Sequence, residues 1–534
     1  MTQATLTDAP VPAAGVGRPV PAGRWSAGVF AVAVIVAFPL FLWLGRDHWF
    51  YLDEWQILGA DGESRTGYLD GHNGHWITWL RLEYRLNFEL WGLRSYLPYQ
   101  VPAVLGHLAS AVLLRQVCRR LGTRGWIATA TALAFLFFGP GRMNMTLGFQ
   151  VSLTASLICW FGMLLLTYDA KAVTRRDWFA LGLGVVGLMT SGLFPAILVG
   201  FGVTTLLRRG PRAATFYALP LGAIYLAWYV TYGHESAFPA RFTGQAARYV
   251  RRLLWAAFDA LGQGGVVAAL LLALAVVGLG VALHRAWRCR LWAEAALPLG
   301  LFAAWLSFSG VTAVTRESLA DLEVGGRVVH ISVALVLPLV AAGAEELARR
   351  RTFLGVAALA PLAIGALQGR DQLSETSVLF RTDPELVSAI AHSPLIVDVP
   401  GNHRPLHDNG FLPPATADWL ARQAAAGRIP EPDDLTTELR LTATNRLALI
   451  QAEAPSDQLA CPALTAPLTV SVRTGDEIRF VGAIEVRVTE GQRRSQPRRF
   501  AALEASVVRA QAGPVDVLVR SVPDVPAWLC PPSA

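Results

Sequence analysis

The sequence predicts a polytopic α-helical membrane protein whose C-terminal part forms a soluble α+β or β-rich domain outside the cytoplasm. Of its 534 residues, 53% are hydrophobic and only 16% are charged, and long apolar runs recur until about residue 368. One soluble core cannot bury so much apolar surface, so we expect a lipid bilayer to cover the remaining apolar surface. The basic residues behind the net charge of +7 cluster between apolar runs, which argues against a nucleic-acid partner.

About eleven stretches approach the roughly 20 apolar residues that a membrane-spanning helix requires. We expect these helices at residues 27–44, 97–114, 126–139, 149–168, 178–191, 193–207, 215–232, 264–283, 293–310, 328–344 and 352–367. The fifth and sixth stretches are short, and they form either two helices around a turn at Ser191 and Gly192 or one long kinked helix.

Basic residues in alternate connections predict the topology. The connections concerned contain Arg115, Arg119, Arg120 and Arg124; Lys171, Arg175 and Arg176; Arg208, Arg209 and Arg212; Arg285, Arg288 and Arg290; and Arg349 to Arg351. The positive-inside rule assigns them to the cytoplasmic side of a plasma (inner) membrane. Since the connections on both sides of the fifth and sixth stretches are basic, we expect a helical hairpin there. The number of helices is then odd, so we expect a cytoplasmic N-terminus and an extracytoplasmic C-terminus.

The predicted membrane domain, residues 25–367, lies between two segments of different composition. Residues 1–24 are rich in Ala, Pro and Gly and lack the short apolar core and cut site of a cleavable signal, which predicts a disordered cytoplasmic tail. Residues 368–534 form the extracytoplasmic domain, and short alternating runs within 466–522 predict a part that resembles a β-sandwich. An amphipathic helix is expected before it, at "ATADWLARQAAAG".

Two of the five cysteines, Cys461 and Cys530, bracket the strand-like part of the exported tail. Outside the cytoplasm, such a pair predicts a disulfide bond. The alternative is that both remain unpaired thiols.

The first exterior loop, at about residues 45–96, combines many charges with many aromatic residues directly after a spanning helix. Within it, "WITWLRLEYRLNFELWGL" has the spacing of an amphipathic helix that lies in the membrane interface. Asp53 and Glu54 follow the first helix closely and are flanked by Tyr51 and Trp55. Ionisable groups in such an apolar setting near the membrane are costly, so these two carboxylates are predicted to be functional.

A carboxylate at this position suits one reaction in particular. Transfer of a sugar from a lipid phosphate to a hydroxyl needs a base for the hydroxyl proton and a cation or metal ion for the departing phosphate. We expect Asp53 to be the base, and Glu54 to orient the acceptor, to bind a divalent cation (Mg²⁺, Mn²⁺ or Ca²⁺) with Asp53, or to tune Asp53 by repulsion. The structural alternative is that both carboxylates only pair with Arg46 or Arg85.

The segment "FYLDEW" resembles the acidic motif in the first exterior loop of the GT-C superfamily of glycosyltransferases, which use polyprenyl-phosphate sugars. "HNGHWITW" and "NMTLGFQ" are similar to segments of actinobacterial members, including relatives of cell-wall arabinofuranosyltransferases and mannosyltransferases. The resemblance covers the N-terminal third best, and then the general layout of helices followed by an exported domain. It implies a GT-C-like fold, Asp53 as catalytic base with Glu54 as its partner, and inversion at the sugar by a single displacement.

The resemblance extends the expected substrate pocket to two more segments. The pocket of the acidic motif is expected to be lined by three residues that come later in the same loop, His72, Asn73 and His75. The alternative is that these residues cap an interfacial helix. In the second exterior loop, Asn144 and Gln150 are expected to contact the substrate. Met143 stands where related sequences often carry a carboxylate, so no acidic or metal-binding role is expected for that loop.

Recognition of the donor phosphate requires a cation. "GGRVVHI" resembles the family's arginine-containing entry to a late helix, which contacts the donor phosphate. Arg327 offers a fork that matches phosphate oxygens, and His330 lies one turn further along the same helical face. Arg241, in the loop after the seventh helix, is another exterior arginine for this role. The alternative for Arg327 is an arginine that snorkels at a helix end.

Together these features predict a membrane glycosyltransferase that moves a sugar from a polyprenyl-phosphate donor to a cell-envelope glycan or glycolipid on the extracytoplasmic side. A polytopic transporter or flippase is one alternative, but no Asp, Glu or Lys falls in the middle of a span, where His107 is the only polar candidate. A ligase of lipid-linked glycans and a receptor or scaffold are the others. No Walker loop is present and no GxGxxG follows a predicted strand, which argues against a cytosolic nucleotide-sugar enzyme.

Overall fold

The structure is a computed structural model, and it describes residues 23–50, 52–62, 66–170, 172–234, 243–316, 324–374, 383–406, 415–453, 462–523 and 525–529. The chain divides into two compact units. The helical unit contains Met1–Gly45, Leu69–Leu80 and Gln100–Glu375, and the loop-and-tail unit contains Arg46–Tyr68, Arg81–Tyr99 and Thr376–Ala534. The predicted disulfide of Cys461 with Cys530 and nearly all of the predicted tail 1–24 fall outside the described residues.

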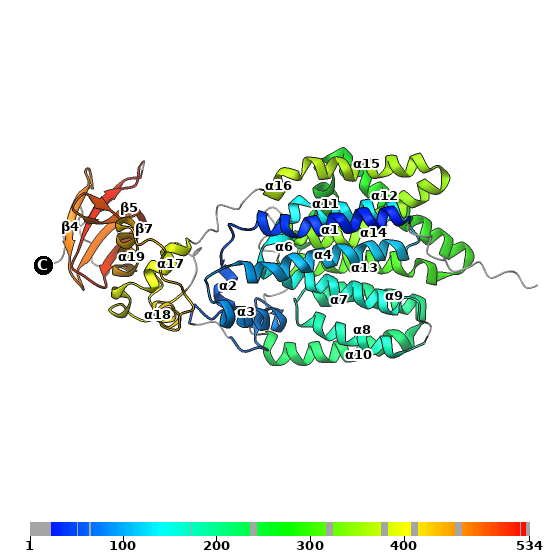
Figure 1. Cartoon of the computed structure of the whole chain (residues 1–534), viewed down its shortest axis with the longest axis horizontal. Helices are drawn as coiled ribbons and strands as arrows, with labels where there is room; N and C mark the ends of the chain where they lie inside the picture. The colour runs from blue at the N-terminus through cyan, green and yellow to red at the C-terminus, as the bar shows by residue number, and fades with distance from the viewer. Residues whose placement is uncertain are drawn as a thin grey trace, which may run out of the picture. The chain divides into compact units, whose positions relative to one another are not determined.

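Within the described residues, the helical unit has an apolar helix at each of the eleven positions that the sequence predicts, and Figure 1 shows their arrangement. They are α1 (Arg24–Leu44), α4 (Leu97–Arg120), α5 (Gly125–Leu136), α7 (Val151–Thr167), α8 (Arg175–Leu188), α9 (Phe194–Arg209), α10 (Pro211–Trp228), α12 (Gly265–Cys289), α13 (Trp292–Thr315), α14 (Gly326–Arg350) and α15 (Thr352–Gln368). A bilayer favours helices because every backbone N–H and C=O must find its partner within the segment. The chain breaks near Ser191 into α8 and α9, so the prediction of two helices there is confirmed.

Among the described residues, seven helices are long and apolar enough to cross a membrane. They are α1, α4, α7 with the turn before it, α10 with the turn after it, α12, α13 and α14. The other four are shorter, with 12 residues in α5, 14 in α8, 16 in α9 and 17 in α15. At a rise of about 1.5 Å per residue, α5 extends only about 18 Å, less than the roughly 30 Å of a hydrocarbon core. The positions of the eleven helices are therefore confirmed, whereas the number that span the membrane stays a prediction.

Helix α14 lies at the centre of the helical unit. In its most apolar 18-residue window 94% of the residues are buried, against 17% for α1. Glycines bring α12 and α14 close together, since a Cβ at Gly343 would lie 2.0 Å from the Leu274 carbonyl oxygen and one at Gly278 would lie 2.4 Å from the Leu339 carbonyl oxygen. Small residues permit the close backbone approach that stabilises helix pairs in lipid. Packing along α14 therefore determines where its first turn lies.

The five basic connections gather at one end of the helical unit. Four contacts join them, namely Arg124 with Glu345, Arg120 with Asp169, Arg285 with Glu346, and Arg208 with the Tyr168 carbonyl oxygen. Each contact links two connections, and together they link all five. This common location agrees with the alternation from which the topology is predicted, and the compartment that this end faces stays a prediction.

Shorter elements connect the helix ends away from these basic connections. They are η1 (Gly139–Gly141), α6 (Arg142–Thr146), η2 (Gly148–Gln150), the π-helical turn η3 (Tyr229–Gly233), α11 (Gly244–Gly262), α16 (Arg370–Ser374), and a hairpin of β1 (Gly71–His72) and β2 (His75–Trp76). The sequence does not predict the hairpin. Trp76 stacks on Trp228 with ring centroids 5.0 Å apart, and Trp228 Nε1 donates to the Leu69 carbonyl at 2.7 Å. These contacts hold the hairpin against α10.

The loop-and-tail unit combines helices of the first exterior loop with the C-terminal residues. Its helices are α2 (Leu52–Ile57), most of α3 (Thr78–Trp91), α17 (Pro384–Ala391), η7 (Pro394–Val397), α18 (Ala417–Ala425) and α19 (Thr437–Ala448). Its strands are β3 (Leu449–Glu453), β4 (Leu468–Val472), β5 (Glu477–Glu490), β6 (Arg493–Arg494), β7 (Arg498–Ala510), β8 (Val515–Ser521) and β9 (Ala527–Leu529). Helices α3 and α18 occur at the two segments predicted to be amphipathic helices.

The β-rich part is confirmed, but its description as a β-sandwich is wrong. The strands β3 to β9 join one antiparallel sheet in the order β3-β7-β5-β8-β4, with β6 and β9 also paired to β5. Helix α19 packs on this sheet (Figure 1), and Asn445 Nδ2 of α19 donates to the Val486 carbonyl of β5 at 3.1 Å. Alternation along a strand predicts a buried face, and a helix covers such a face as well as a second sheet does.

The end of α3 packs against the C-terminal residues within the loop-and-tail unit. Arg428 forms an ion pair with Glu89 at 2.5 Å, and the Arg428 carbonyl accepts a hydrogen bond from the Leu93 N–H at 2.7 Å. Trp419 of α18 stacks on Phe88 with ring centroids 5.7 Å apart. One compact unit thus unites segments that the sequence assigns to the first exterior loop and to the C-terminal domain.

Substitution of Asp177 by Asn should destabilise the helical unit. The buried Asp177 carboxylate accepts hydrogen bonds from Arg209 at 2.5 Å and Tyr217 at 2.6 Å, and so joins α8, α9 and α10. Asp177→Asn leaves the buried guanidinium without its counter-charge, so we expect the free energy of unfolding in detergent to fall by about 3 to 5 kcal/mol. The control Asp169→Asn removes an exposed pair with Arg120 and should cost less than about 1 kcal/mol. Similar losses in both variants would contradict this account.

Candidate functional site

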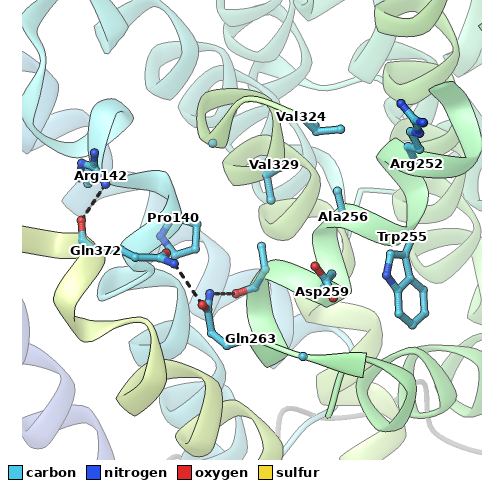
Figure 2. Close-up of a pocket in the computed structure, with 13 residues that line it drawn as sticks. Pro140, Arg142, Arg252, Trp255, Ala256, Asp259, Gln263, Val324, Val329 and Gln372 are labelled. Atoms are coloured by element: carbon cyan, nitrogen blue, oxygen red, sulfur yellow. Dashed lines mark hydrogen bonds between the residues drawn. The ribbon is translucent and has the colours of Figure 1, made fainter. Parts of the chain in front are cut away.

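A pocket of about 810 Å³ lies in the helical unit beside the start of α14 (Figure 2). Its lining residues are Pro140, Arg142, Arg252, Trp255, Ala256, Asp259, Ala260, Gln263, Gly264, Val324, Gly326, Val329 and Gln372. They come mainly from η1, α6, α11, α14 and α16. Two arginines outweigh the single carboxylate of Asp259, and with the apolar and amide groups they suit a ligand with an anionic head and an apolar tail.

Arg142 of α6 and Arg252 of α11 give the pocket its positive charge. Figure 2 shows them on opposite sides of the pocket. Arg142 Nη1 also donates to the Gln372 carbonyl at 3.1 Å, which ties α6 to α16. Planar guanidinium groups form paired hydrogen bonds with phosphate oxygens. Of the arginines predicted for this role, Arg241 lies outside the described residues, and Arg327 is not among the described residues that line the pocket.

One face of α11 forms a wall of the pocket. The lining residues of this helix and its end recur every three or four positions: Arg252, Trp255, Ala256, Asp259, Ala260 and Gln263. Gln263 Nε2 donates to the Ala260 carbonyl at 2.8 Å, and Gln372 Nε2 of α16 donates to Gln263 Oε1 at 3.1 Å (Figure 2). These bonds fix the floor of the pocket between α11 and α16.

The first turn of α14 forms another part of the wall. This helix begins at Gly326, where a Cβ would lie 2.0 Å from the Pro140 carbonyl oxygen, so only glycine permits the approach. The first N–H groups of a helix lack intrahelical partners, and the helix dipole is positive at this end. With the two arginines, this turn favours an anionic group such as a phosphate.

Arg327 follows Gly326 on α14 and contacts a second predicted residue. Its carbonyl accepts a hydrogen bond from Asn144 Nδ2 at 2.9 Å. Burial raises the pKa of Tyr249 on α11, and the positive charges of Arg316 and Arg327 oppose that rise. The structure therefore brings Asn144 and Arg327 together.

His330 and Asn144 are both fully buried, and Gln150 is buried in η2. His330 Nε2 lies 3.2 Å from His107 Nδ1, and His107 Nε2 lies 3.0 Å from the Leu136 carbonyl oxygen. The sequence singles out His107 only as a polar residue within a span. Its pairing with His330 becomes visible only in the fold, because the two residues belong to α4 and α14.

The predicted residues His72, Asn73 and His75 lie together on the β1–β2 hairpin of the helical unit. Asn73 occupies the turn with a φ of +50°, and its Nδ2 donates to His72 Nε2 at 3.2 Å. His75 Nδ1 accepts a hydrogen bond from the Gly192 N–H at 2.9 Å, at the break between α8 and α9. These contacts position the hairpin, and a role in substrate binding stays a prediction.

The acidic motif lies on α2 of the loop-and-tail unit. Glu54 is fully buried, and its Oε1 accepts hydrogen bonds from the Tyr84 and Tyr96 hydroxyls, the latter at 2.7 Å. Asp53, the preceding residue, is half-buried. A buried carboxylate is fixed by the donors that replace its water. The two neighbouring carboxylates therefore differ, because Glu54 is enclosed by the protein and Asp53 is the more accessible.

Sequence reasoning missed the tyrosines that hold Glu54 and the arginines of the pocket. Tyr84 had a detectable signal, since Leu80, Tyr84 and Phe88 recur every four residues and form the buried face of α3. Arg252 lies on the pocket face of an amphipathic helix whose pattern is also visible in the sequence. No local pattern points to Tyr96, which lies just before α4.

Glu83 adds a third carboxyl group near the acidic motif. Burial, opposed by a hydrogen bond from Asn87 and reinforced by the charge of Glu54, raises the pKa of Glu83 from 4.5 to about 9. Glu83 therefore holds its proton at neutral pH. Burial also raises the pKa of Tyr84, with the charge of Glu54 as the next cause, so this hydroxyl remains a hydrogen-bond donor.

A divalent cation at Asp53 and Glu54 stays a prediction. Within the part of the chain that the structure describes, no group of three or more His, Cys, Asp or Glu side chains could hold a metal ion. One Glu54 oxygen already accepts two hydrogen bonds. An ion at α2 would therefore depend on Asp53 with water or substrate oxygens as its further ligands.

No family model matches the chain, and no curated protein matches it. Among solved structures, it is similar to ArnT from Cupriavidus metallidurans bound to undecaprenyl phosphate, with 14% identity and a TM-score of 0.43 over 75% of this chain and 85% of that chain. ArnT from the same organism in the apo state gives 14% identity and a TM-score of 0.43 over 92% of this chain and 99% of that chain. At this identity and TM-score, the similarity establishes neither family nor activity.

Stability of the loop-and-tail unit should depend on pH through Glu83. The folded state keeps the proton up to a pKa of about 9, whereas the unfolded chain releases it near 4.5. The contribution of protonated Glu83 to the free energy of unfolding is therefore complete below pH 4.5. It is lost as the pH rises toward 9, by at most about 1.4 kcal/mol per pH unit. Glu83→Gln should remove this slope from denaturation curves between pH 5 and 8.

The control for that measurement is Glu89→Gln, on the exposed side of the same helix, which should leave the slope unchanged. A slope that persists in Glu83→Gln would show that another group titrates.

Proposed function

We propose that the chain is a membrane glycosyltransferase of the GT-C type that transfers a sugar from a polyprenyl phosphate to a cell-envelope glycan or glycolipid outside the cytoplasm. The observation that carries the proposal is the pocket, where Arg142, Arg252 and the first turn of α14 favour a phosphate within an otherwise apolar bundle of helices. A polyprenyl phosphate combines an anionic head with a long apolar tail and so matches both properties.

Asp53 is the general base of the proposed reaction. Its carboxylate takes the proton of the acceptor hydroxyl while the hydroxyl oxygen attacks the anomeric carbon of the donor sugar. The bond from that carbon to the phosphate oxygen breaks, and its electron pair leaves with the polyprenyl phosphate. Arg142 and Arg252 stabilise the charge that develops on the departing phosphate. A single displacement of this kind inverts the anomeric carbon.

Glu54 positions Asp53 in this proposal. It is enclosed and held by Tyr84 and Tyr96, so it keeps α2 in one orientation, and Asp53 is the preceding residue on that helix. The C-terminal domain shares a compact unit with α2 and with most of α3. We propose that this domain holds the acceptor near the acidic motif.

Asp53→Asn should abolish sugar transfer. An amide cannot take the hydroxyl proton, so we expect transfer to fall at least about 100-fold when purified protein is incubated with radiolabelled polyprenyl-phosphate sugars and envelope acceptors. The control Asp47→Asn changes an exposed carboxylate of the same loop, which pairs with Arg46, and should leave transfer nearly unchanged.

Undiminished transfer in the folded Asp53→Asn protein would remove Asp53 as base. Movement of the lipid across a vesicle membrane without a new glycosidic bond would instead establish a flippase. Transfer of a preassembled glycan rather than a single sugar would establish a ligase of lipid-linked glycans.

Arg252→Gln should weaken the binding of polyprenyl phosphate at least about 10-fold, because a charged hydrogen bond contributes about 1.5 to 3 kcal/mol. Binding is measured by displacement of a fluorescent polyprenyl phosphate from protein in neutral-lipid nanodiscs. Arg251→Gln is the matched control, since this neighbouring arginine of α11 does not line the pocket as far as the structure describes it. Equal effects of both substitutions would indicate attraction by general positive charge and not a site.

A further inference from the structure

Two buried histidines form a hydrogen-bond chain beside the pocket. His107 of α4 and His330 of α14 are fully buried, and their ring centroids lie 5.2 Å apart. His330 Nε2 lies 3.2 Å from His107 Nδ1, and His107 Nε2 lies 3.0 Å from the Leu136 carbonyl oxygen. The rings of Phe41 and Phe135 pack against the pair. The chain therefore runs from a backbone carbonyl through two imidazoles in an apolar environment.

The carbonyl determines the direction of every hydrogen bond in this chain. The Leu136 oxygen can only accept, so His107 Nε2 carries a hydrogen. An unpaired charge among aromatic rings is costly, so both imidazoles are neutral. A neutral His107 accepts at Nδ1, and His330 must then donate from Nε2. It follows that His330 Nδ1 carries a lone pair and no hydrogen.

That lone pair lacks a donor, and so does a second buried acceptor. Among the described residues, neither His330 Nδ1 nor Asn144 Oδ1 has a hydrogen-bond partner, although both are buried. Asn144 Nδ2 donates to the Arg327 carbonyl, which fixes the oxygen end of the amide. Arg327 and His330 are three residues apart and so share one face of α14. Buried acceptors without donors are costly, which indicates that a ligand supplies the donors.

The two acceptors belong to the backbone segments that form the pocket wall. On α14, Val329 lines the pocket and His330 follows it. On the opposing segment, Pro140 and Arg142 line the pocket, and Gly141 between them packs on His330 so closely that a Cβ would lie 2.5 Å from the ring Cδ2. A ligand head group in the pocket therefore lies beside the same two segments that carry the acceptors.

We propose that His330 Nδ1 and Asn144 Oδ1 form a subsite that accepts hydrogen bonds from hydroxyl groups of the donor sugar, and that His107 is the positioning residue that sets the tautomer of His330. The inference rests on the proposed function, since it assigns the hydroxyls to a polyprenyl-phosphate sugar. Sugar hydroxyls donate hydrogen bonds, whereas an ionised phosphodiester only accepts them. The arginines and the first turn of α14 thus bind the phosphate, and the two acceptors bind the sugar.

Two lipids distinguish this subsite from the phosphate site. Full-length protein in neutral-lipid nanodiscs is titrated with polyprenyl phosphate and with polyprenyl-phosphate pentoses and hexoses. His330→Gln retains an N–H for His107 and loses the acceptor at the Nδ1 position. We expect it to bind the best sugar-bearing lipid at least about 10-fold more weakly and the bare lipid within about 2-fold of wild type. His330→Asn retains an oxygen near the Nδ1 position and should bind the sugar-bearing lipid more tightly than His330→Gln does.

The positioning role of His107 is tested through the protonation of His330. His107→Gln retains a donor for the Leu136 carbonyl and an acceptor for His330, whereas His107→Phe retains a ring and removes both. Nitrogen NMR of protein labelled in its histidines should show His330 Nδ1 without hydrogen in wild type and in His107→Gln, and both tautomers in His107→Phe. Affinity for the sugar-bearing lipid should follow the same order.

Three results would overturn the subsite: equal losses for both lipids in His330→Gln, unchanged affinities in that variant, or a hydrogen on His330 Nδ1 in the wild type. Wild-type protein that binds neither lipid would instead overturn the proposed function. The two failures are therefore distinguishable.

Discussion

The loop-and-tail unit depends on one buried carboxylate, that of Glu54. Removal of a carboxylate from water is costly unless donors replace the water, and the hydroxyls of Tyr84 and Tyr96 do so. The three residues come from α2, from α3 and from the segment just before α4, so this contact joins the two ends of the first exterior loop. Asp53 precedes Glu54 on α2, and its position follows from that of the buried residue. In the proposed transferase, precise placement of the catalytic group would contribute several kcal/mol, which would give the costly burial of Glu54 a function.

In the helical unit, the corresponding constraint is the packing of α14. Its neighbours approach along most of its length, and glycines allow backbone contact with α12 and with η1. The first turn of α14 therefore has little freedom, and it carries three features at once: the positive end of the helix dipole, the pocket-lining Val329, and His330 at the end of a hydrogen-bond chain. A rigid helix end is a suitable base for a binding site because little conformational entropy is lost when a ligand binds there.

Composition and periodicity suffice to predict the eleven helices, the amphipathic α3 and the β-rich part, because each depends on residues close together in the sequence. Contacts between distant segments cannot be predicted in this way. Tyr84 and Glu54 are 30 residues apart, and His330 and His107 are 223 residues apart, so no local sequence pattern indicates either contact. Arg252 could not be separated from its neighbouring arginines before the pocket face of α11 was known. Alternation along the strands predicts a buried face but not the helix that covers it.

The proposed function requires that the pocket of the helical unit bind the phosphate of the donor lipid. Cryo-electron microscopy of the Asp53→Asn protein with a polyprenyl-phosphate sugar and an acceptor glycan tests this requirement most directly. We predict phosphate oxygens within about 3 Å of the Arg142 or the Arg252 guanidinium group. A phosphate bound elsewhere would contradict the proposal.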